Sequence, residues 1–385
     1  MTVSRLRNIP GIGVDRMGDA ADASKNPNIL RLENLDTDLR PPPEAIRRTH
    51  EAVDDDAANS YLPFTGQAAL RRAVVARMKQ SAGTEYDPES ECIVSAGGLA
   101  GILNVLLSIL EPGDEVVLTD PTYAGLINRV RLADGVPVFA RLIPGADGWR
   151  LDLESLARAI GPRTRALLVM SPSMPSGFVA TEAEWAAIAA HCVRPDAWLV
   201  YDAAMERILF DGRRVIHPAS LAGMRERTIT VGSVSKEFRM IGWRVGWIVG
   251  PAPIMADVRL TSLSNVVCQV GIGMPGATAA LTCADDGVAA AVGQWQARRD
   301  FLLRALDDLP AIRPDGGWSM LIDTEQLGIP APEASRMLLA KGEVAATPMT
   351  GWGPDAARYL RFVFANEPVS RLADIRARVR TAWHL

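Results

Sequence analysis

The sequence is poor in the residues that bind metal ions or form disulfide bridges. The chain has 385 residues but only four histidines and four cysteines, and the cysteines lie far apart at Cys92, Cys192, Cys268 and Cys283. Closely spaced pairs, which would indicate a zinc site or a disulfide framework, are absent. We therefore expect no metal, and we expect the cysteines to be small buried side chains in a reducing compartment.

Long apolar runs and blocks of positive charge are also missing. The longest apolar runs have about eight to ten residues, too few to cross a bilayer. The first 28 residues are polar and contain Pro10, Gly11 and Gly13, which does not fit a signal peptide. The formal net charge is -4 and no basic block occurs, so nucleic-acid binding has no electrostatic support. We expect a cytoplasmic protein that binds neither membranes nor nucleic acids.

Lysine is scarce, because arginine supplies nearly all the positive charge. The lysines are Lys25, Lys79, Lys236 and Lys341. Lys236 lies in a small, apolar, glycine-rich segment, where burial would lower the pKa of its amine and make it a nucleophile toward an aldehyde. The structural alternative is a lysine that extends from a strand end toward solvent.

Short apolar segments alternate with helix-length segments between about residues 90 and 250. The hydrophobic content of 48% is ample for a large core. Continuous apolar runs predict buried strands at residues 92–95, 115–119, 136–142, 166–170, 198–201, 228–231 and 245–249. Helices are expected between several of them, at residues 101–110, 123–134, 153–160 and 182–191. This alternation predicts an α/β domain with a mainly parallel, seven-stranded sheet, whose ligands bind at the carboxyl ends of the strands.

The pattern changes after about residue 280. A long helix rich in alanine and arginine is followed by short strands around residues 318–322 and 359–364. These elements predict a second, smaller α+β domain.

Polar and aromatic side chains follow several predicted strands directly. The segment Ser95–Gly101 ends one strand and opens a helix, so its N–H groups can face an anion. Asp202 ends another strand, where it can pair with a protonated pyridine nitrogen or begin a turn. Tyr123 can stack on a flat cofactor or belong to the core. Arg361 lies within an apolar strand and requires an anion, either a structural carboxylate or that of a substrate.

The segment Ser233–Gly246 is the most specific feature of the sequence. Ser233, Ser235 and Arg244 can supply two hydroxyl groups and a guanidinium to a phosphate. The order S-x-S-K, followed eight residues later by R-x-G, resembles the lysine segment of the class I/II aminotransferases, the aspartate-aminotransferase-like branch of fold-type I pyridoxal-phosphate enzymes. The resemblance covers residues 30–385.

The resemblance implies an architecture and partners. It implies a large cofactor domain, a small domain built from both chain ends, and a homodimer with shared active sites. We accordingly assign residues 1–45 to an N-terminal arm and part of the small domain, 46–280 to the large domain and 281–385 to the rest of the small domain. The expected substrates are an L-amino acid and a 2-oxo acid.

It also implies a role for each matching residue. Lys236 would form a Schiff base with pyridoxal 5′-phosphate, Asp202 would pair with the ring nitrogen, and Tyr123 would stack on the ring. Arg361 would bind the α-carboxylate of the substrate. The phosphate would be bound by residues of the helix start and the lysine segment, and by a tyrosine from the partner subunit: Gly97, Gly98, Leu99, Ser233, Arg244 and Tyr61.

Two positions depart from the family pattern. An asparagine that donates to the phenolic oxygen of the cofactor and touches the substrate carboxylate is replaced by Met174, and a tyrosine that donates to the same oxygen is replaced by Met205. A thioether donates no hydrogen bond. We therefore predict a Schiff base that stays protonated through neutral and mildly alkaline pH, unless a nearby serine (Ser171, Ser173 or Ser176) replaces the lost donors.

The sequence constrains the reaction and its substrate less than it constrains the fold and the cofactor. Transamination is favoured, and a lyase, decarboxylase or oxidase reaction of an amino acid is the alternative; a non-catalytic effector domain is a third reading, weakened by the lack of a DNA-binding module. Apolar side chains near the expected site, Trp318, Trp352, Phe64 and the two methionines, suggest a roomy pocket for an aromatic or long aliphatic substrate. Such residues also pack cores.

Overall fold

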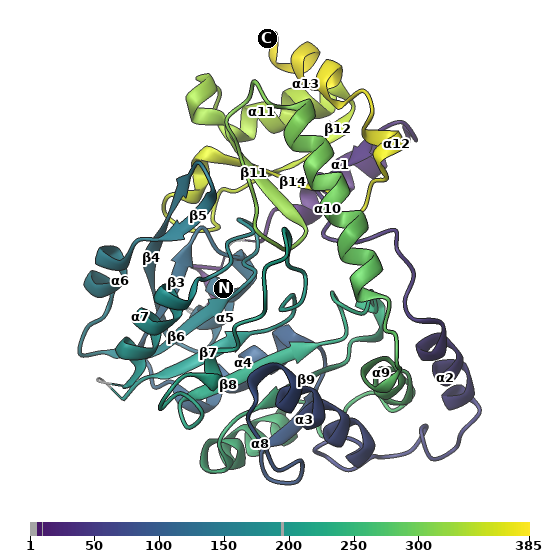
Figure 1. Ribbon diagram of the computed structural model, residues 1–385, viewed down its shortest axis with the longest axis vertical. Coiled ribbons are helices and arrows are strands. Elements are labelled where there is room, and N and C mark those ends of the chain that lie inside the picture. Colours follow the sequence, from purple (N-terminus) through teal and green to yellow (C-terminus); the bar gives the residue numbers. More distant parts are fainter. Residues whose placement is uncertain (1–5, 10, 194–195) are drawn as a thin grey trace.

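The computed structural model describes residues 6–9, 11–193 and 196–385. A large twisted sheet forms the lower part of the molecule in Figure 1, and a smaller sheet with its own helices lies above it. The described part of the large sheet has eight strands in the order β2 (Cys92–Ser95), β9 (Gly246–Val249), β8 (Thr228–Ser233), β7 (Trp198–Asp202), β6 (Thr164–Met170), β3 (Glu115–Asp120), β4 (Val136–Gly145) and β5 (Gly148–Leu151).

The strands of this sheet confirm the predicted mainly parallel α/β architecture. Strands β8, β7, β6, β3 and β4 are parallel to one another, while β9 runs antiparallel between β2 and β8. All seven predicted strands are present. The eighth, β5, forms a tight hairpin with the end of β4, in which Gly145 pairs with Gly148. Its four residues include Arg150 and carry no apolar run, so the sequence pattern gave no sign of it.

Helices cover both faces of the sheet because the chain winds outward in two directions from its centre. The connection from β3 to β4 runs toward one edge, and the connection from β6 to β7 runs toward the other. Right-handed crossovers then place their helices on opposite faces. One layer contains α4 (Gly98–Ile109), α5 (Ala124–Leu132) and α8 (Ala252–Val266), and the other contains α6 (Leu153–Ala159) and α7 (Glu182–Val193).

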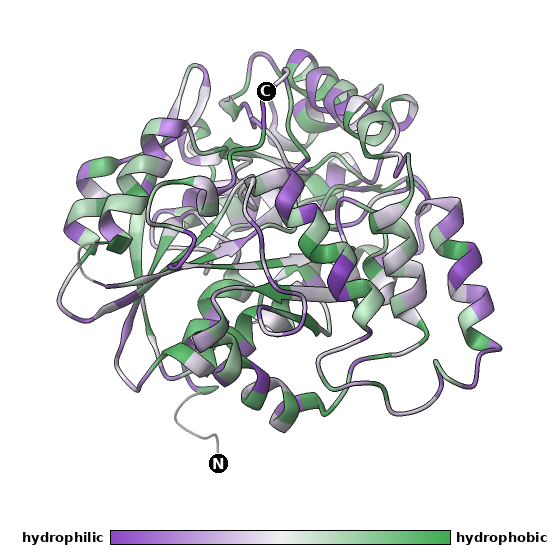
Figure 2. Ribbon diagram, turned by 60° about the horizontal axis from the view of Figure 1, so that its bottom comes forward, coloured by the Kyte–Doolittle hydropathy of each residue, from purple (hydrophilic) through white to green (hydrophobic). Residues whose placement is uncertain are grey.

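The core follows from continuous apolar strands between these layers. Ile93, Val200, Ile229 and Ile248 are fully buried in neighbouring strands of the sheet. Figure 2 shows the hydrophobic strands enclosed by helices whose polar residues lie outward. Burial of each such side chain stabilises the fold by about 1.5–3 kcal/mol relative to exposure. Three further helices pack near the β2 edge: α2 (Pro43–Val53), α3 (Ala68–Ala82) and α9 (Gly273–Thr282).

The smaller α+β unit is built from both chain ends. Its sheet has the order β10 (Ala311–Ile312), β11 (Ser319–Asp323), β14 (Tyr359–Val363) and β13 (Thr347–Pro348). From the N-terminal side, β1 (Leu30–Arg31) pairs in parallel with β12 (Val344–Ala345). The helices of this unit are α1 (Val14–Ala23), α10 (Val288–Ala305), α11 (Ala331–Met337), α12 (Val369–Leu372) and α13 (Ile375–Trp383). The domain boundaries at residues 45/46 and 280/281 stay predictions.

Helix α10 runs upward from the level of the large sheet to the smaller one in Figure 1. Among the described helices, none is both long and apolar enough to cross a membrane. The carboxyl ends of β6, β7 and β8 open toward the smaller unit, and the N-termini of α4 and α5 meet them there. This junction contains the candidate site.

Candidate active site

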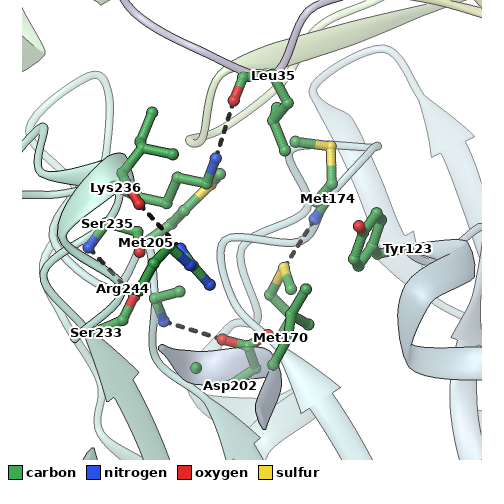
Figure 3. Close-up of a pocket in the computed structure, with 14 residues that line it drawn as sticks. Leu35, Tyr123, Met170, Met174, Asp202, Met205, Ser233, Ser235, Lys236 and Arg244 are labelled. Carbon is green, nitrogen blue, oxygen red and sulfur yellow. Dashed lines mark hydrogen bonds between the residues drawn. The ribbon is translucent and has the colours of Figure 1, made fainter. Parts of the chain in front are cut away.

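A cavity lies at the carboxyl ends of the central strands, and it gathers most of the predicted site residues (Figure 3). Ten of them line it: Gly98, Leu99, Tyr123, Met174, Asp202, Met205, Ser233, Ser235, Lys236 and Arg244. The other lining residues are Leu35, Met170, Ala204 and Ile241. Residues far apart in the sequence are therefore brought together around one space.

Lys236 follows β8 and projects into this cavity. Its Nζ donates to the carbonyl oxygen of Leu35 at 3.0 Å and lies 4.7 Å from the centre of the Trp318 ring. Burial lowers the pKa of the lysine to about 7, although the nearby carboxylate of Asp36 acts in the opposite direction. A lysine with this pKa is partly neutral at neutral pH, and a neutral amine can attack an aldehyde.

Asp202 ends β7 at the floor of the cavity. Its carboxylate is only 3% exposed and accepts a hydrogen bond from the Ala204 N–H at 3.1 Å. Burial raises the pKa of Asp202 to about 6, and the Ala204 N–H and the charges of Arg129 and Lys236 oppose this rise. A buried carboxylate with so few donors favours a cationic partner.

The start of α4 and the loop after Lys236 form a cradle that only glycines fit. Gly97 has φ +83°, and a Cβ there would lie 2.5 Å from Nη2 of Arg244. A Cβ on Gly246 would lie 2.6 Å from the carbonyl carbon of Gly97. No side chain caps α4, so its first N–H groups stay available beside Ser233 and Arg244. Uncapped helix N-termini with a nearby guanidinium bind anions.

Arg361 lies just outside the lining, in β14, and is fully buried. Its guanidinium donates to the carbonyl oxygen of Glu33 at 2.6 Å, to Oγ1 of Thr347 at 3.2 Å and to Sδ of Met174 at 3.6 Å. All three acceptors are uncharged, and Nε has no partner among the described residues. Burial lowers the pKa of Arg361 to about 10, and the nearby Tyr123 and Glu33 act in the opposite direction. Among the described residues, no carboxylate forms a direct ion pair with this buried cation, so the guanidinium can still bind an anion.

Aromatic rings pack beside Arg361 at the edge of the cavity. The Trp352 ring lies 4.9 Å from the Arg361 guanidinium and packs edge-on against Tyr123 with ring centres 5.3 Å apart. Tyr123 immediately precedes α5 and lines the cavity. Trp318 is fully buried, and its indole Nε1 has no hydrogen-bond partner in the described part of the chain.

Three methionines contribute to the wall of the cavity (Figure 3). Met174 and Met205 both line the cavity, and Met170 joins them. Their sulfur atoms accept hydrogen bonds weakly and donate none. The three serines predicted as replacement donors are absent from the cavity lining: Oγ of Ser171 and Oγ of Ser176 accept backbone N–H groups of Ala180 and Phe178, and Oγ of Ser173 is buried without a partner among the described residues.

The last predicted residue, Tyr61, is 83% exposed and is not part of the cavity lining within this chain. Four lining residues are not predicted by the sequence: Leu35, Met170, Ala204 and Ile241. Neither is Arg129, whose charge acts on Asp202. Leu35 contributes a backbone carbonyl, which no residue type signals. Arg129 offered a detectable sign, since it interrupts a mostly apolar helix. Among the described residues, no group of three or more potential metal ligands occurs.

Fold and site together define an α/β enzyme of fold type I that uses pyridoxal phosphate. More specifically, the chain belongs to the aminotransferase class I and II family, whose model matches residues 29–378. It is therefore a pyridoxal-phosphate-dependent transaminase.

Relatives and solved structures agree with this assignment. The chain is 36% identical over 362 residues to a probable N-succinyldiaminopimelate aminotransferase of Mycobacterium tuberculosis, covering 93% of this chain and 90% of the relative. It is 33% identical to the arginine–pyruvate transaminase of Pseudomonas aeruginosa, covering 91% and 89%. The structure of the M. tuberculosis N-succinyldiaminopimelate aminotransferase superposes with a TM-score of 0.93 at 32% identity, over 99% of this chain and 100% of the other. The aspartate aminotransferase of Thermus thermophilus with maleate gives 0.89 at 28% identity, over 100% and 98%.

The side chains of the cavity fit pyridoxal phosphate. The glycine cradle and Arg244 suit its phosphate, a buried carboxylate suits its ring nitrogen, and a lysine amine of lowered pKa suits its aldehyde. The fit is weakest at the phenolic oxygen, where Met174 and Met205 offer no donor.

Proposed function

We propose that Lys236 is the residue that binds the cofactor covalently, and that the enzyme moves an amino group from an apolar L-amino acid to a 2-oxo acid. Pyridoxal phosphate supplies an aldehyde that attaches to amino groups and a ring that accepts electrons from the substrate Cα. Ser233, Ser235, Arg244 and the N-terminus of α4, including Gly97, Gly98 and Leu99, would bind its phosphate. Tyr123 would cover the face of its ring.

The observation that carries the proposal is the buried Arg361, which forms no ion pair with a carboxylate among the described residues. Its buried guanidinium has only neutral acceptors, and it lies near enough to Lys236 for its charge to lower the pKa of that amine. An α-carboxylate would form a direct ion pair with Arg361 and would present the substrate Cα to Lys236. Freed from the cofactor by the substrate amino group, Lys236 would take the proton from Cα and return it at C4′.

A single-turnover experiment tests the reaction. Purified protein loaded with pyridoxal phosphate is mixed with one amino acid, and the bound cofactor is followed by absorption and then identified by mass spectrometry. Accumulation of pyridoxamine phosphate supports the proposal. Turnover without it would indicate a lyase, decarboxylase or oxidase reaction, and an unchanged cofactor with every amino acid would indicate a binding protein.

Support for an apolar substrate comes from the cavity wall. Met170, Met174, Met205 and Ile241 line the cavity together with Lys236. The lining contains one arginine, Arg244, which lies at the phosphate cradle, so a second carboxylate on the substrate would meet no further guanidinium there. Trp318 would add an aromatic surface beside the amine. A panel of amino donors tests this point, and reaction with aspartate and glutamate alone would overturn it.

A homodimer is part of the same proposal. Tyr61 is 83% exposed, and other apolar side chains are exposed as well, including Phe64 at 49%, Leu260 at 64% and Val270 at 53%. We infer that Tyr61 reaches the phosphate of the partner subunit. Hybrid dimers of Lys236→Ala and Tyr61→Phe chains test this, because only a shared site leaves one of the two sites intact. Activity of the mixture no higher than the sum of the parents would contradict it. The cytoplasmic location stays a prediction.

A further inference from the structure

Arg129 lies in α5, six residues after Tyr123, and does not itself line the cavity. It is half-buried, yet both of its described hydrogen bonds go to backbone carbonyls. Its Nε donates to the carbonyl oxygen of Leu99 at 2.8 Å, and its Nη1 donates to that of Gly125 at 2.8 Å. No ion pair of Arg129 with a carboxylate occurs among the described residues. Because no described carboxylate pairs with Arg129 directly, its positive charge acts on other buried groups nearby.

The charge of Arg129 acts on two residues of the cavity, Tyr123 and Asp202. Burial lowers the pKa of Arg129, and the nearby Tyr123 and Asp202 act in the opposite direction. For Asp202, Arg129 is the stronger of the two cations that oppose the effect of burial, and Lys236 is the weaker. The Ala204 N–H opposes the effect of burial most strongly, and the charges of Arg129 and Lys236 add to it, so Arg129 contributes to the stability of the ionised carboxylate.

The same side chain also connects two parts of the cavity wall. Leu99 belongs to the first turn of α4 and lines the cavity. Gly125 lies directly under the Tyr123 ring, since a Cβ on Gly125 would lie 2.3 Å from Cε1 of that ring. By binding both carbonyls, Arg129 fixes the base of the Tyr123 ring relative to the start of α4. The hydrogen bonds thus link the part of the cavity wall that contains Tyr123 to the start of α4, where the phosphate is proposed to bind.

We propose that Arg129 is a positioning residue that keeps Asp202 ionised and fixes Tyr123 relative to the start of helix α4. This inference rests on the proposed pairing of Asp202 with the cofactor nitrogen. In that pair, the proton can lie on the nitrogen or on the carboxylate. A positive charge behind the carboxylate favours the proton on the nitrogen, because it stabilises the ionised aspartate. A protonated ring withdraws electrons from the substrate Cα more strongly.

The test compares charge and hydrogen bonding at position 129 in the cofactor-loaded enzyme. Arg129→Gln removes the charge, Arg129→Lys keeps it, and Arg131→Gln removes an exposed arginine of the same helix that donates to the Asn8 carbonyl. The first measurement is the NMR chemical shift of the ring nitrogen, observed with ¹⁵N-labelled pyridoxal phosphate. We expect Arg129→Gln to move it toward the value of a neutral pyridine, and we expect the other two variants to keep the wild-type value.

The second measurement is the rate at which an amino acid converts the cofactor to its amine form. We expect this rate to fall about tenfold or more in Arg129→Gln, which corresponds to roughly one pKa unit at the ring nitrogen. Half-saturation for the amino acid should change little, since Arg129 does not reach the substrate. An Arg129→Gln enzyme with the wild-type nitrogen shift and rate would overturn the proposal. So would equal losses in Arg129→Gln and Arg129→Lys, which would indicate a structural role only.

If Arg129→Gln does not fold, a second variant, Arg129→His, tests the same proposal. In Arg129→His the charge at this position disappears as the imidazole loses its proton, so the ring-nitrogen signal should move toward neutral pyridine with rising pH. A signal in Arg129→His that stays constant would contradict the proposal. If wild-type protein converts no amino acid at all, the proposed reaction fails, yet the nitrogen shifts still decide the role of Arg129.

Discussion

Arg361 donates from Nη1 to the thioether sulfur of Met174 at 3.6 Å, so the buried cation of the site contacts a side chain that carries no charge. The same methionine also accepts a hydrogen bond from Oγ of Ser319 at 3.4 Å. Both contacts use the sulfur as an acceptor, which leaves Met174 with nothing to donate toward the cavity. The phenolic oxygen of a bound cofactor would therefore receive no hydrogen bond from Met174.

We expect the Schiff base of Lys236 to keep its proton through neutral and mildly alkaline pH. Donors to the phenolic oxygen would stabilise the deprotonated form, and neither Met174 nor Met205 provides one. Met174→Asn and Met205→Tyr should each lower the pKa of the Schiff base by about one unit, the equivalent of one hydrogen bond of about 1.4 kcal/mol. A spectral pH titration measures this. Met170→Leu, which adds no donor, is the control, and a wild-type midpoint below neutrality would refute the argument.

Substitution of Arg361 should lower the activity of the enzyme without lowering its stability. Arg361→Leu removes the cation proposed to bind the substrate carboxylate, and loss of such a buried pair costs about 2–5 kcal/mol. The kcat/KM for the amino donor should therefore fall by roughly 30-fold to several-thousand-fold. The free energy of unfolding should stay equal or rise, because an apolar side chain replaces a buried charge whose Nε has no described partner. Chemical denaturation of both proteins checks this. A fall of about 3–5 kcal/mol would instead assign Arg361 a structural role.

The lowered pKa of Lys236 predicts how fast cofactor-depleted protein takes up pyridoxal phosphate. The neutral amine is the nucleophile, and burial lowers the pKa of the lysine to about 7. The rate of covalent attachment should rise with pH up to about 7 and then level off. A lysine with its ordinary pKa of 10.5 would give a rate still rising above pH 9. Stopped-flow absorption measures the rate, borohydride trapping locates the attachment, and Lys236→Arg is the control that should show none.

The sequence predicted the parts of this site that depend on local chemistry. Seven strands were found because their buried residues form continuous apolar runs, and Lys236 was found because a lone lysine followed a strand in a glycine-rich segment. Long-range partners could not be predicted in the same way. The carbonyl of Glu33 that binds Arg361, and that of Leu35 that binds Lys236, are backbone groups from the distant N-terminal segment. Any residue type offers such a carbonyl, so only the folded chain identifies them.

Arg129 illustrates an intermediate case. An arginine in a mostly apolar helix indicates a buried or partly buried charge, but the sequence does not say which group it faces. The answer depends on how α5 packs beside α4 and against the large sheet, which is a property of the whole fold. The strand β5 was missed for a different reason: its pairing comes from a tight hairpin rather than from an apolar pattern.

The close approach of Gly246 to α4 gives a prediction with a matched control. A Cβ at Gly246 would lie 2.6 Å from the Gly97 carbonyl carbon and 2.8 Å from the Gly98 backbone nitrogen, so Gly246→Ala must push the first turn of α4 away from Arg244. The affinity for pyridoxal phosphate should fall by about 10- to 100-fold, since misplaced phosphate donors cost roughly 1.4–2.8 kcal/mol. Gly242→Ala is the control, because no atom lies within 4 Å of its added Cβ. Titration of cofactor-depleted protein measures both, and equal affinities for the two variants would show that the cradle does not set phosphate binding.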